Sequence, residues 1–134
     1  MQTFLPYNDI QKTVECLDWK RLGCQRKESW QILCCLKGIH SLRWKYHPAV
    51  KMWAGYENYL TMYMNNCIIE WIKRGYNNTM EIMTVDNIVV PDWFGGPIHA
   101  SHRSALLHKN IEWYGKFGWT EEPKMEYYWP TKNV

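Results

Sequence analysis

The chain has 134 residues with a formal net charge of +3, of which 46% are hydrophobic and 22% charged. This balance excludes an intrinsically disordered protein, and no apolar run approaches the ~20 residues that would span a membrane. The five cysteines are odd in number and form no C-x-x-C pair, and the first ten residues lack the basic start and apolar segment of a signal peptide. We therefore expect a cytoplasmic protein with reduced thiols and no membrane partner.

The first part of the chain predicts an extended segment followed by two helices. Residues 2–7 have no helical period, and helices are expected to start near Asp9 and Asp18, where a carboxylate can cap the free N–H groups of the first turn. The second helix is expected to run to about Leu36 and to stop at Gly38, because glycine readily takes the left-handed conformation beyond a helix end.

The middle of the chain contains the clearest helical pattern. The step from His47 to Pro48 is biased away from helix, so we expect a loop there and a short helix that begins at Pro48. From Tyr56 to Arg74, apolar residues recur every three or four positions, and Gly75 follows as the expected cap. This apolar side is expected to face the core.

The remaining chain predicts loops, one further helix and an aromatic tail. Asn87–Pro91 ("NIVVP") is a candidate short strand, a helix is expected from His99 to Lys109, and Gly115 and Gly118 interrupt the residues beyond that helix. Nine Trp and nine Tyr are spread along the chain. We predict one compact, mostly α, all-helical domain over residues 1–134, with three main helices and long aromatic-rich loops.

One carboxylate, Glu28, stands within a basic stretch of the second predicted helix, after Lys20, Arg21, Arg26 and Lys27. On an ordinary solvated helix, Glu28 would pair with a neighbouring cation, an interaction worth under ~1 kcal/mol. On a nucleic-acid-binding face, the cations would hold phosphates and Glu28 would act as an acid or base. Both interpretations fit the pattern.

A second candidate region is the sequence Ser-His-Arg-Ser at Ser101–Ser104, close to a predicted helix start. Hydroxyls, Arg103 and free N–H groups make a phosphate cradle, so His102 and Arg103 are candidate phosphate ligands, the alternative being histidines that only form hydrogen bonds. His99 and His102 supply two of the three or four ligands that zinc needs, and no third ligand is evident in the sequence around them, so no metal is expected. The other histidines, spread through the chain, are His40, His47 and His108. No phosphate-loop or dinucleotide motif is present, so no cofactor is expected.

Three segments carry a family resemblance. Residues 16–33 read CLDWKRLGCQRKESWQIL, residues 56–77 read YENYLTMYMNNCIIEWIKRGYN, and residues 113–119 read WYGKFGW. The first is similar to the catalytic helix, the second to the long middle helix with its Lys-Arg-Gly-aromatic-Asn end, and the third to the aromatic C-terminal segment of one family. In order and approximate spacing, the chain resembles the pyrimidine-dimer DNA glycosylases of the phage endonuclease V type.

The resemblance implies an all-α enzyme, cytoplasmic or virus-encoded and acting in the host cell, that binds damaged duplex DNA. It would excise a pyrimidine dimer or another modified base through an imine on the chain's own α-amine, followed by β-elimination at the abasic site. Glu28 matches the family's catalytic carboxylate, and Arg21, Arg26 and Lys27 would contact phosphates.

Residue 2 decides which amine is available. Gln2 is too large for the usual removal of Met1, so Met1 would supply the α-amine, with Lys20 or Lys27 as alternative nucleophiles. An α-amino group ordinarily has a pKa of about 7.7–8.0, so a fraction of such groups is neutral and nucleophilic at pH 7. The alternative function is a non-catalytic protein that binds nucleic acid or a nucleotide on the same scaffold.

Overall fold

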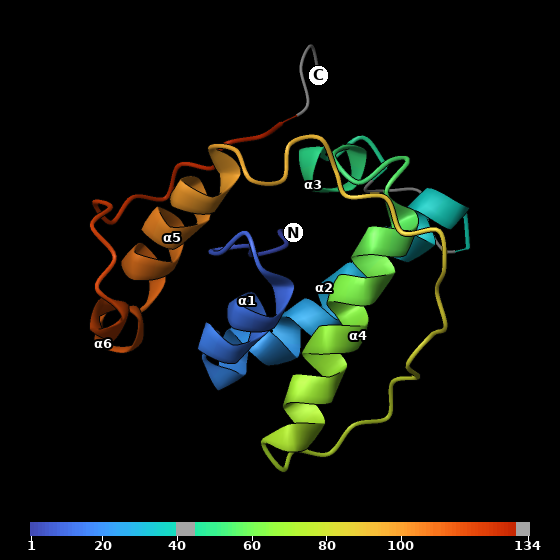
Figure 1. Ribbon diagram of the computed structural model, residues 1–134, viewed down its shortest axis with the longest axis horizontal. Helices are drawn as coiled ribbons and strands as arrows, with labels where there is room; N and C mark the ends of the chain where they lie inside the picture. Colours follow the sequence, from blue (N-terminus) through green and yellow to red (C-terminus); the bar gives the residue numbers. More distant parts are fainter. Residues whose placement is uncertain (40–44, 131–134) are drawn as a thin grey trace.

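The computed structural model (Figure 1) describes residues 1–39 and 45–130, and His40 lies outside the described residues. The elements in chain order are α1 (Ile10–Cys16), α2 (Trp19–Lys37), α3 (Pro48–Lys51), α4 (Glu57–Lys73), α5 (Ile98–Lys109), α6 (Ile111–Tyr114) and the 3-10 turn η2 (Gly115–Phe117). The predicted mostly α fold with three main helices is confirmed, these helices being α2, α4 and α5. Within the described residues, no helix has the length and apolar character needed to cross a membrane.

The predicted strand at Asn87–Pro91 is wrong. Residues 87–90 are exposed and have no strand conformation, and a short apolar run forms a strand only where a neighbouring strand accepts its backbone hydrogen bonds. This segment belongs instead to a long connection between α4 and α5. Asn65 holds that connection through Met83, whose carbonyl accepts from Asn65 Nδ2 at 2.7 Å and whose N–H donates to Asn65 Oδ1 at 3.0 Å.

The helix ends follow the local sequence. Asp9 caps α1, its Oδ1 accepting from the Lys12 N–H at 3.0 Å, and Gly38 ends α2 in the left-handed conformation with φ 66°. Asp18 occupies the position before α2 as predicted, but its side chain makes no capping bond. Its carboxylate pairs instead with Arg21 at 3.2 Å and accepts from the Tyr114 hydroxyl.

The apolar side of α4 forms the centre of the core together with α2. Its buried residues are Tyr59, Leu60, Tyr63, Met64, Cys67 and Ile68, as the period predicted. The apolar pattern in the sequence extends beyond the buried part of the helix at its C-terminal end, where Ile72 is 49% exposed. This last turn of α4 forms the lower end of the molecule in Figure 1, beyond the helices that cover the rest of its apolar side.

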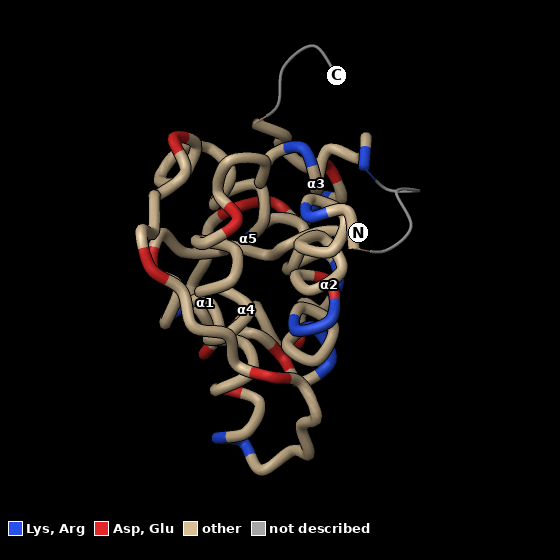
Figure 2. Tube along the Cα trace, turned by 90° about the vertical axis from the view of Figure 1, so that its right-hand side faces the viewer, with Lys and Arg blue, Asp and Glu red and all other residues tan. Residues whose placement is uncertain are grey.

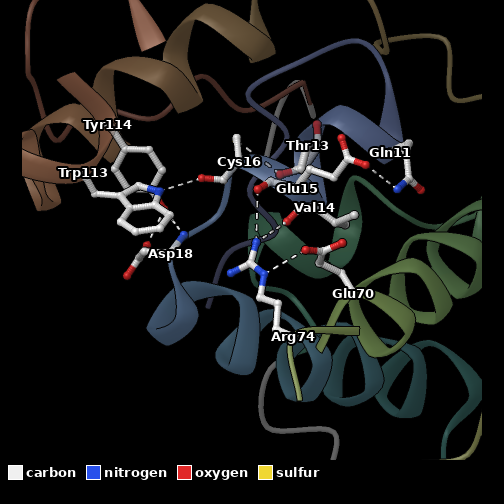
Figure 3. A network of polar contacts seen from close by, with 10 residues as sticks. All are labelled: Gln11, Thr13, Val14, Glu15, Cys16, Asp18, Glu70, Arg74, Trp113 and Tyr114. Carbon is white, nitrogen blue, oxygen red and sulfur yellow. Dashed lines mark hydrogen bonds and ion pairs between the residues drawn. The ribbon is translucent and has the colours of Figure 1, made fainter. Parts of the chain in front are cut away.

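A network of polar contacts fixes the turn between α1 and α2 (Figure 3). Arg74, directly after α4, donates to Glu70 at 2.8 Å and to the carbonyls of Val14 and Glu15 at 3.2 and 3.1 Å. On the other side, the Trp113 indole N–H donates to the Cys16 carbonyl at 2.8 Å. Since unpaired carbonyls remain at a helix C-terminus, these contacts stabilise the end of α1 and the turn that leads into α2.

Candidate active site

The segment Gln2–Pro6 is buried and extended, although it belongs to no helix. Its backbone bonds to side chains: the Phe4 N–H donates to Gln25 Oε1 and the Leu5 N–H donates to His102 Nδ1, each at 2.9 Å. Buried N–H groups require such partners. Side chains of α2 and α5 therefore fix the path of the N-terminus, which lies in the middle of the molecule with α5 on one side and α4 on the other (Figure 1).

Gln25 uses both ends of its amide to connect this segment with Glu28. Its Oε1 accepts from the Phe4 N–H and from the Tyr63 hydroxyl, the latter at 2.6 Å. Its Nε2 donates to the Gln2 carbonyl and to Glu28 Oε2, both at 2.9 Å. Gln25 is fully buried, so losing it would leave buried polar groups unpaired. It positions Glu28 relative to the first residues of the chain.

Glu28 is half-buried and lies near the α-amine of Met1. Burial raises the pKa of the Glu28 carboxyl above its ordinary 4.5, and the strongest opposing influence is the positive charge on the Met1 α-amine, followed by the Gln2 backbone N–H and Lys109. A carboxyl with a raised pKa beside an amine is suited to exchanging protons nearer to neutral pH. The structure thus brings together Glu28 and Met1, the two predicted catalytic groups.

His47, which caps α3, is a second neighbour of the Met1 amine. Its Nδ1 accepts from the Ala49 N–H at 3.0 Å, and its pKa is lowered by burial and by the charge on the Met1 amine. Both influences favour the neutral imidazole. Its ring packs edge-on against Trp129, with 5.8 Å between the centroids. Sequence patterns did not assign His47 to a site, because nothing local connects it with residue 1.

Tyr127 brings the C-terminal segment to the same place. Burial, and then the charge of Glu28, raise the pKa of the Tyr127 hydroxyl, while Arg21 lowers it. The Tyr127 ring contacts Phe4 and Trp129 edge-on, at centroid distances of 6.3 and 5.7 Å. The C-terminal segment has no periodicity in the sequence, so nothing in the sequence except the number of its aromatic residues indicated that Tyr127 would lie at this site.

Of the predicted phosphate-binding cations, Arg21 lies on the Glu28 side of α2, because residues seven apart return to nearly the same face of a helix. Arg21 is near enough to influence Tyr127, and it pairs with Asp18 at 3.2 Å. Lys27 is exposed and lines a surface hollow together with Arg26. Figure 2 shows the N-terminus beside α2, with the Lys and Arg positions of that helix in blue.

Arg26 lies on a different flank of α2. It is only 7% exposed, its guanidinium carbon is 4.3 Å from the Trp71 ring centroid, and its NH1 donates to Asn78 Oδ1 at 2.7 Å. Helix geometry explains the separation, because residues two apart differ by roughly 200° around the axis. Arg26 and Glu28 therefore face different parts of the surface.

His102 and Arg103 both hold the N-terminal segment, and of the two only Arg103 also lines an open surface hollow. His102 is fully buried, and burial lowers its pKa to about 3, which keeps it neutral as the acceptor of the Leu5 N–H. Arg103 donates to the Pro6 carbonyl and to Glu121, both at 2.8 Å. A cradle of free N–H groups would require helix α5 to start at Ser101–Ser104, but α5 starts before these residues.

The start of α5 explains this difference. Because α5 begins at Ile98, Ser101 lies inside the first turn and its N–H donates to the Pro97 carbonyl at 3.2 Å. His99 is also engaged, since its Nε2 accepts from the Gly95 N–H at 2.8 Å and its Nδ1 contacts the Leu5 carbonyl at 2.7 Å. Within residues 1–39 and 45–130, no three His, Cys, Asp or Glu side chains are grouped as metal ligands.

Comparison with known protein families gives a match over the first part of the chain. A family model described as pyrimidine dimer DNA glycosylase matches residues 1–84 of the 134. The matched part contains the N-terminal segment and helices α1 to α4, and with them Met1, Gln25 and Glu28. Neither the curated proteins nor the solved structures contain a match. Since the family model covers more than half of the chain and agrees with the resemblance carried by its motifs, the chain belongs to the pyrimidine dimer DNA glycosylase family.

Proposed function

We propose that this protein excises a pyrimidine dimer or a related damaged base from duplex DNA and then cleaves the strand at the abasic site. The observation that supports this most is the proximity of the Met1 α-amine to the half-buried Glu28, with Gln25 bonded to both Gln2 and Glu28. An amine beside a carboxyl that can hold or release a proton is the minimum set of groups for an imine mechanism.

In the proposed first step, the neutral Met1 amine attacks C1′ of the damaged nucleotide. The bond between C1′ and the base breaks, its electrons leave with the base, and the base takes up a proton. Glu28, as a carboxylate, stabilises the positive charge that develops at C1′. The amine loses a proton and the sugar ring opens, which leaves an imine between Met1 and C1′.

The second step is β-elimination from that imine. Glu28 accepts a proton from C2′, the bond between C3′ and its oxygen breaks, and the strand leaves with a 5′-phosphate. Water then hydrolyses the imine, which releases the unsaturated sugar and restores the amine. Arg21 holds a phosphate near the site, and His102 and Arg103 act indirectly by fixing the segment that carries the amine.

Borohydride trapping tests the proposal, because borohydride reduces an imine to a stable covalent adduct. Wild-type protein incubated with dimer-containing or abasic duplex DNA is expected to form an adduct that mass spectrometry locates on Met1. Glu28→Gln is expected to slow adduct formation by about 100-fold or more, the usual range for a lost acid or base. Glu15→Gln, an exposed carboxylate on α1, is the matched control and should react like wild type.

Three outcomes would contradict parts of this mechanism. An adduct on Lys20 or Lys27 would assign the nucleophile to a lysine. Duplex binding without any adduct would favour the non-catalytic alternative. Equal rates for Glu28→Gln and Glu15→Gln would remove Glu28 from the chemistry.

A further inference from the structure

A hollow of about 300 Å³ lies on the flank of α2 that carries Arg26. It is lined by Trp19, Lys20, Gly23, Cys24, Arg26 and Lys27 of α2 and by Trp71 of α4. The lining contains three cations and no carboxylate. Neither Glu28 nor Met1 contributes to it, so the hollow is separate from the proposed catalytic groups.

Arg26 is a buried charge without an acidic partner. Among the residues that the structure describes, its polar contact is with the Asn78 amide oxygen, no carboxylate forms an ion pair with it, and its Nε has no hydrogen-bond partner. Burial lowers the pKa of its guanidinium. Because a buried charge is costly unless it is compensated, an anion in the hollow would stabilise the arrangement.

The aromatic wall of the hollow is firmly placed. A Cβ on Gly23 would lie 3.0 Å from the Trp71 ring, closer than an ordinary van der Waals contact, so glycine allows this ring to lie close against α2 and under Arg26. The Trp71 indole N–H donates to the Asn77 carbonyl at 2.7 Å. On the other side, Trp19 is 59% exposed, an unusual exposure for a large ring. It presents a free face at the rim of a basic hollow.

We propose that this hollow binds an unpaired stretch of a DNA strand, with a phosphate held between Arg26, Lys20 and Lys27 and a base stacked on Trp19. Cations that follow the backbone, together with an aromatic ring, form the chemistry by which proteins hold single strands. A paired base has its faces covered by its neighbours, so an intact duplex does not offer this stack. The proposal rests on the proposed function only in taking DNA as the partner.

Cys24 provides a readout that does not depend on catalysis. All five cysteines belong to the described residues, and Cys24, which lines the hollow, is the exposed one. A maleimide should therefore alkylate Cys24 first. A saturating short 5′-phosphorylated oligothymidylate is expected to slow this alkylation about fivefold or more, while thymidine and inorganic phosphate, which each lack half of the recognised group, protect far less.

Two substitutions test the hollow without disturbing the buried Arg26. Trp19→Ala is expected to weaken oligothymidylate binding about fivefold or more, the effect of one lost base stack. Lys20→Ala is expected to lower the slope of log affinity against log salt by about 0.7, the effect of one lost phosphate contact on a single strand. Lys12→Ala removes an equal charge from an exposed position on α1 and should leave both measurements unchanged.

The outcomes separate this proposal from the catalytic one. Unchanged alkylation with saturating oligothymidylate, equal protection by inorganic phosphate alone, or the same affinity for Lys20→Ala and Lys12→Ala would each overturn it. In the Glu28→Gln variant, oligothymidylate should protect Cys24 from alkylation as it does in the wild-type protein. Protection without trapped adduct would therefore refute the catalytic proposal alone, and trapping without protection would refute this one alone.

Discussion

Replacing Gln25 by leucine tests whether this side chain holds the N-terminal segment. The change removes the partners of two buried backbone groups, the Phe4 N–H and the Gln2 carbonyl, together with the contact to Glu28 Oε2. Each buried group left unpaired costs about 1–3 kcal/mol. Leucine offsets part of this by burying apolar surface, so we expect the free energy of unfolding to fall by about 2–4 kcal/mol.

Urea denaturation followed by circular dichroism measures this loss. With a slope of about 2 kcal/mol per M urea, the middle of the usual range for small domains, the midpoint should fall by about 1–2 M. Gln31→Leu makes the same chemical change at an exposed position of α2 and should change stability by less than about 0.5 kcal/mol. Equal midpoints for the two variants would refute the conclusion that Gln25 holds the segment.

The same variant separates stability from positioning. At urea concentrations well below its denaturation midpoint, the Gln25→Leu protein remains folded, but the Met1 amine and Glu28 lose the side chain that connects them. Because small displacements of reacting groups cost large factors in rate, borohydride trapping is expected to slow by about tenfold or more. A folded Gln25→Leu protein that traps DNA at the wild-type rate would show that Glu28 and Met1 need no such connection.

Three further substitutions test the contacts that shape the site. The pKa of His102 is about 3 in the folded protein and has its ordinary value of 6.5 in the unfolded chain. Between pH 6.5 and pH 3 the unfolded chain therefore binds more protons than the folded protein. The free energy of unfolding should fall as the pH drops through this range, by up to about 1.4 kcal/mol per pH unit. His102→Asn, which keeps an acceptor, should reduce this slope in urea midpoints measured across that range. Arg74→Met should cost about 3 kcal/mol in the same assay, since it leaves the largely buried Glu70 unpaired, and adding Glu70→Gln should recover part of the loss. Tyr114→Phe should cost about 1–3 kcal/mol, because the Asp18 N–H loses its 3.1 Å partner; a thermal midpoint equal to that of wild type would contradict it.

The helices were determined largely by local sequence. The period of α4 follows from its own residues, and Asp9, Gly38 and Pro48 mark helix ends because their conformational preferences are intrinsic. Glu28 could be singled out because it stands between cations in one helix. Local sequence was insufficient at Asn87–Pro91, where a strand would have needed a partner that the fold does not supply.

The site itself was decided by tertiary structure. Residues 2–6 have no period, and their backbone partners come from side chains 21 to 97 positions away, such as Gln25 and His102. The same contacts turn His102 and Arg103 toward the N-terminal segment, and the fold also places His47 near the amine and Tyr127 near Glu28. No local pattern encodes such pairings, since they arise only when three helices close around an extended segment whose buried N–H and C=O groups must all be satisfied.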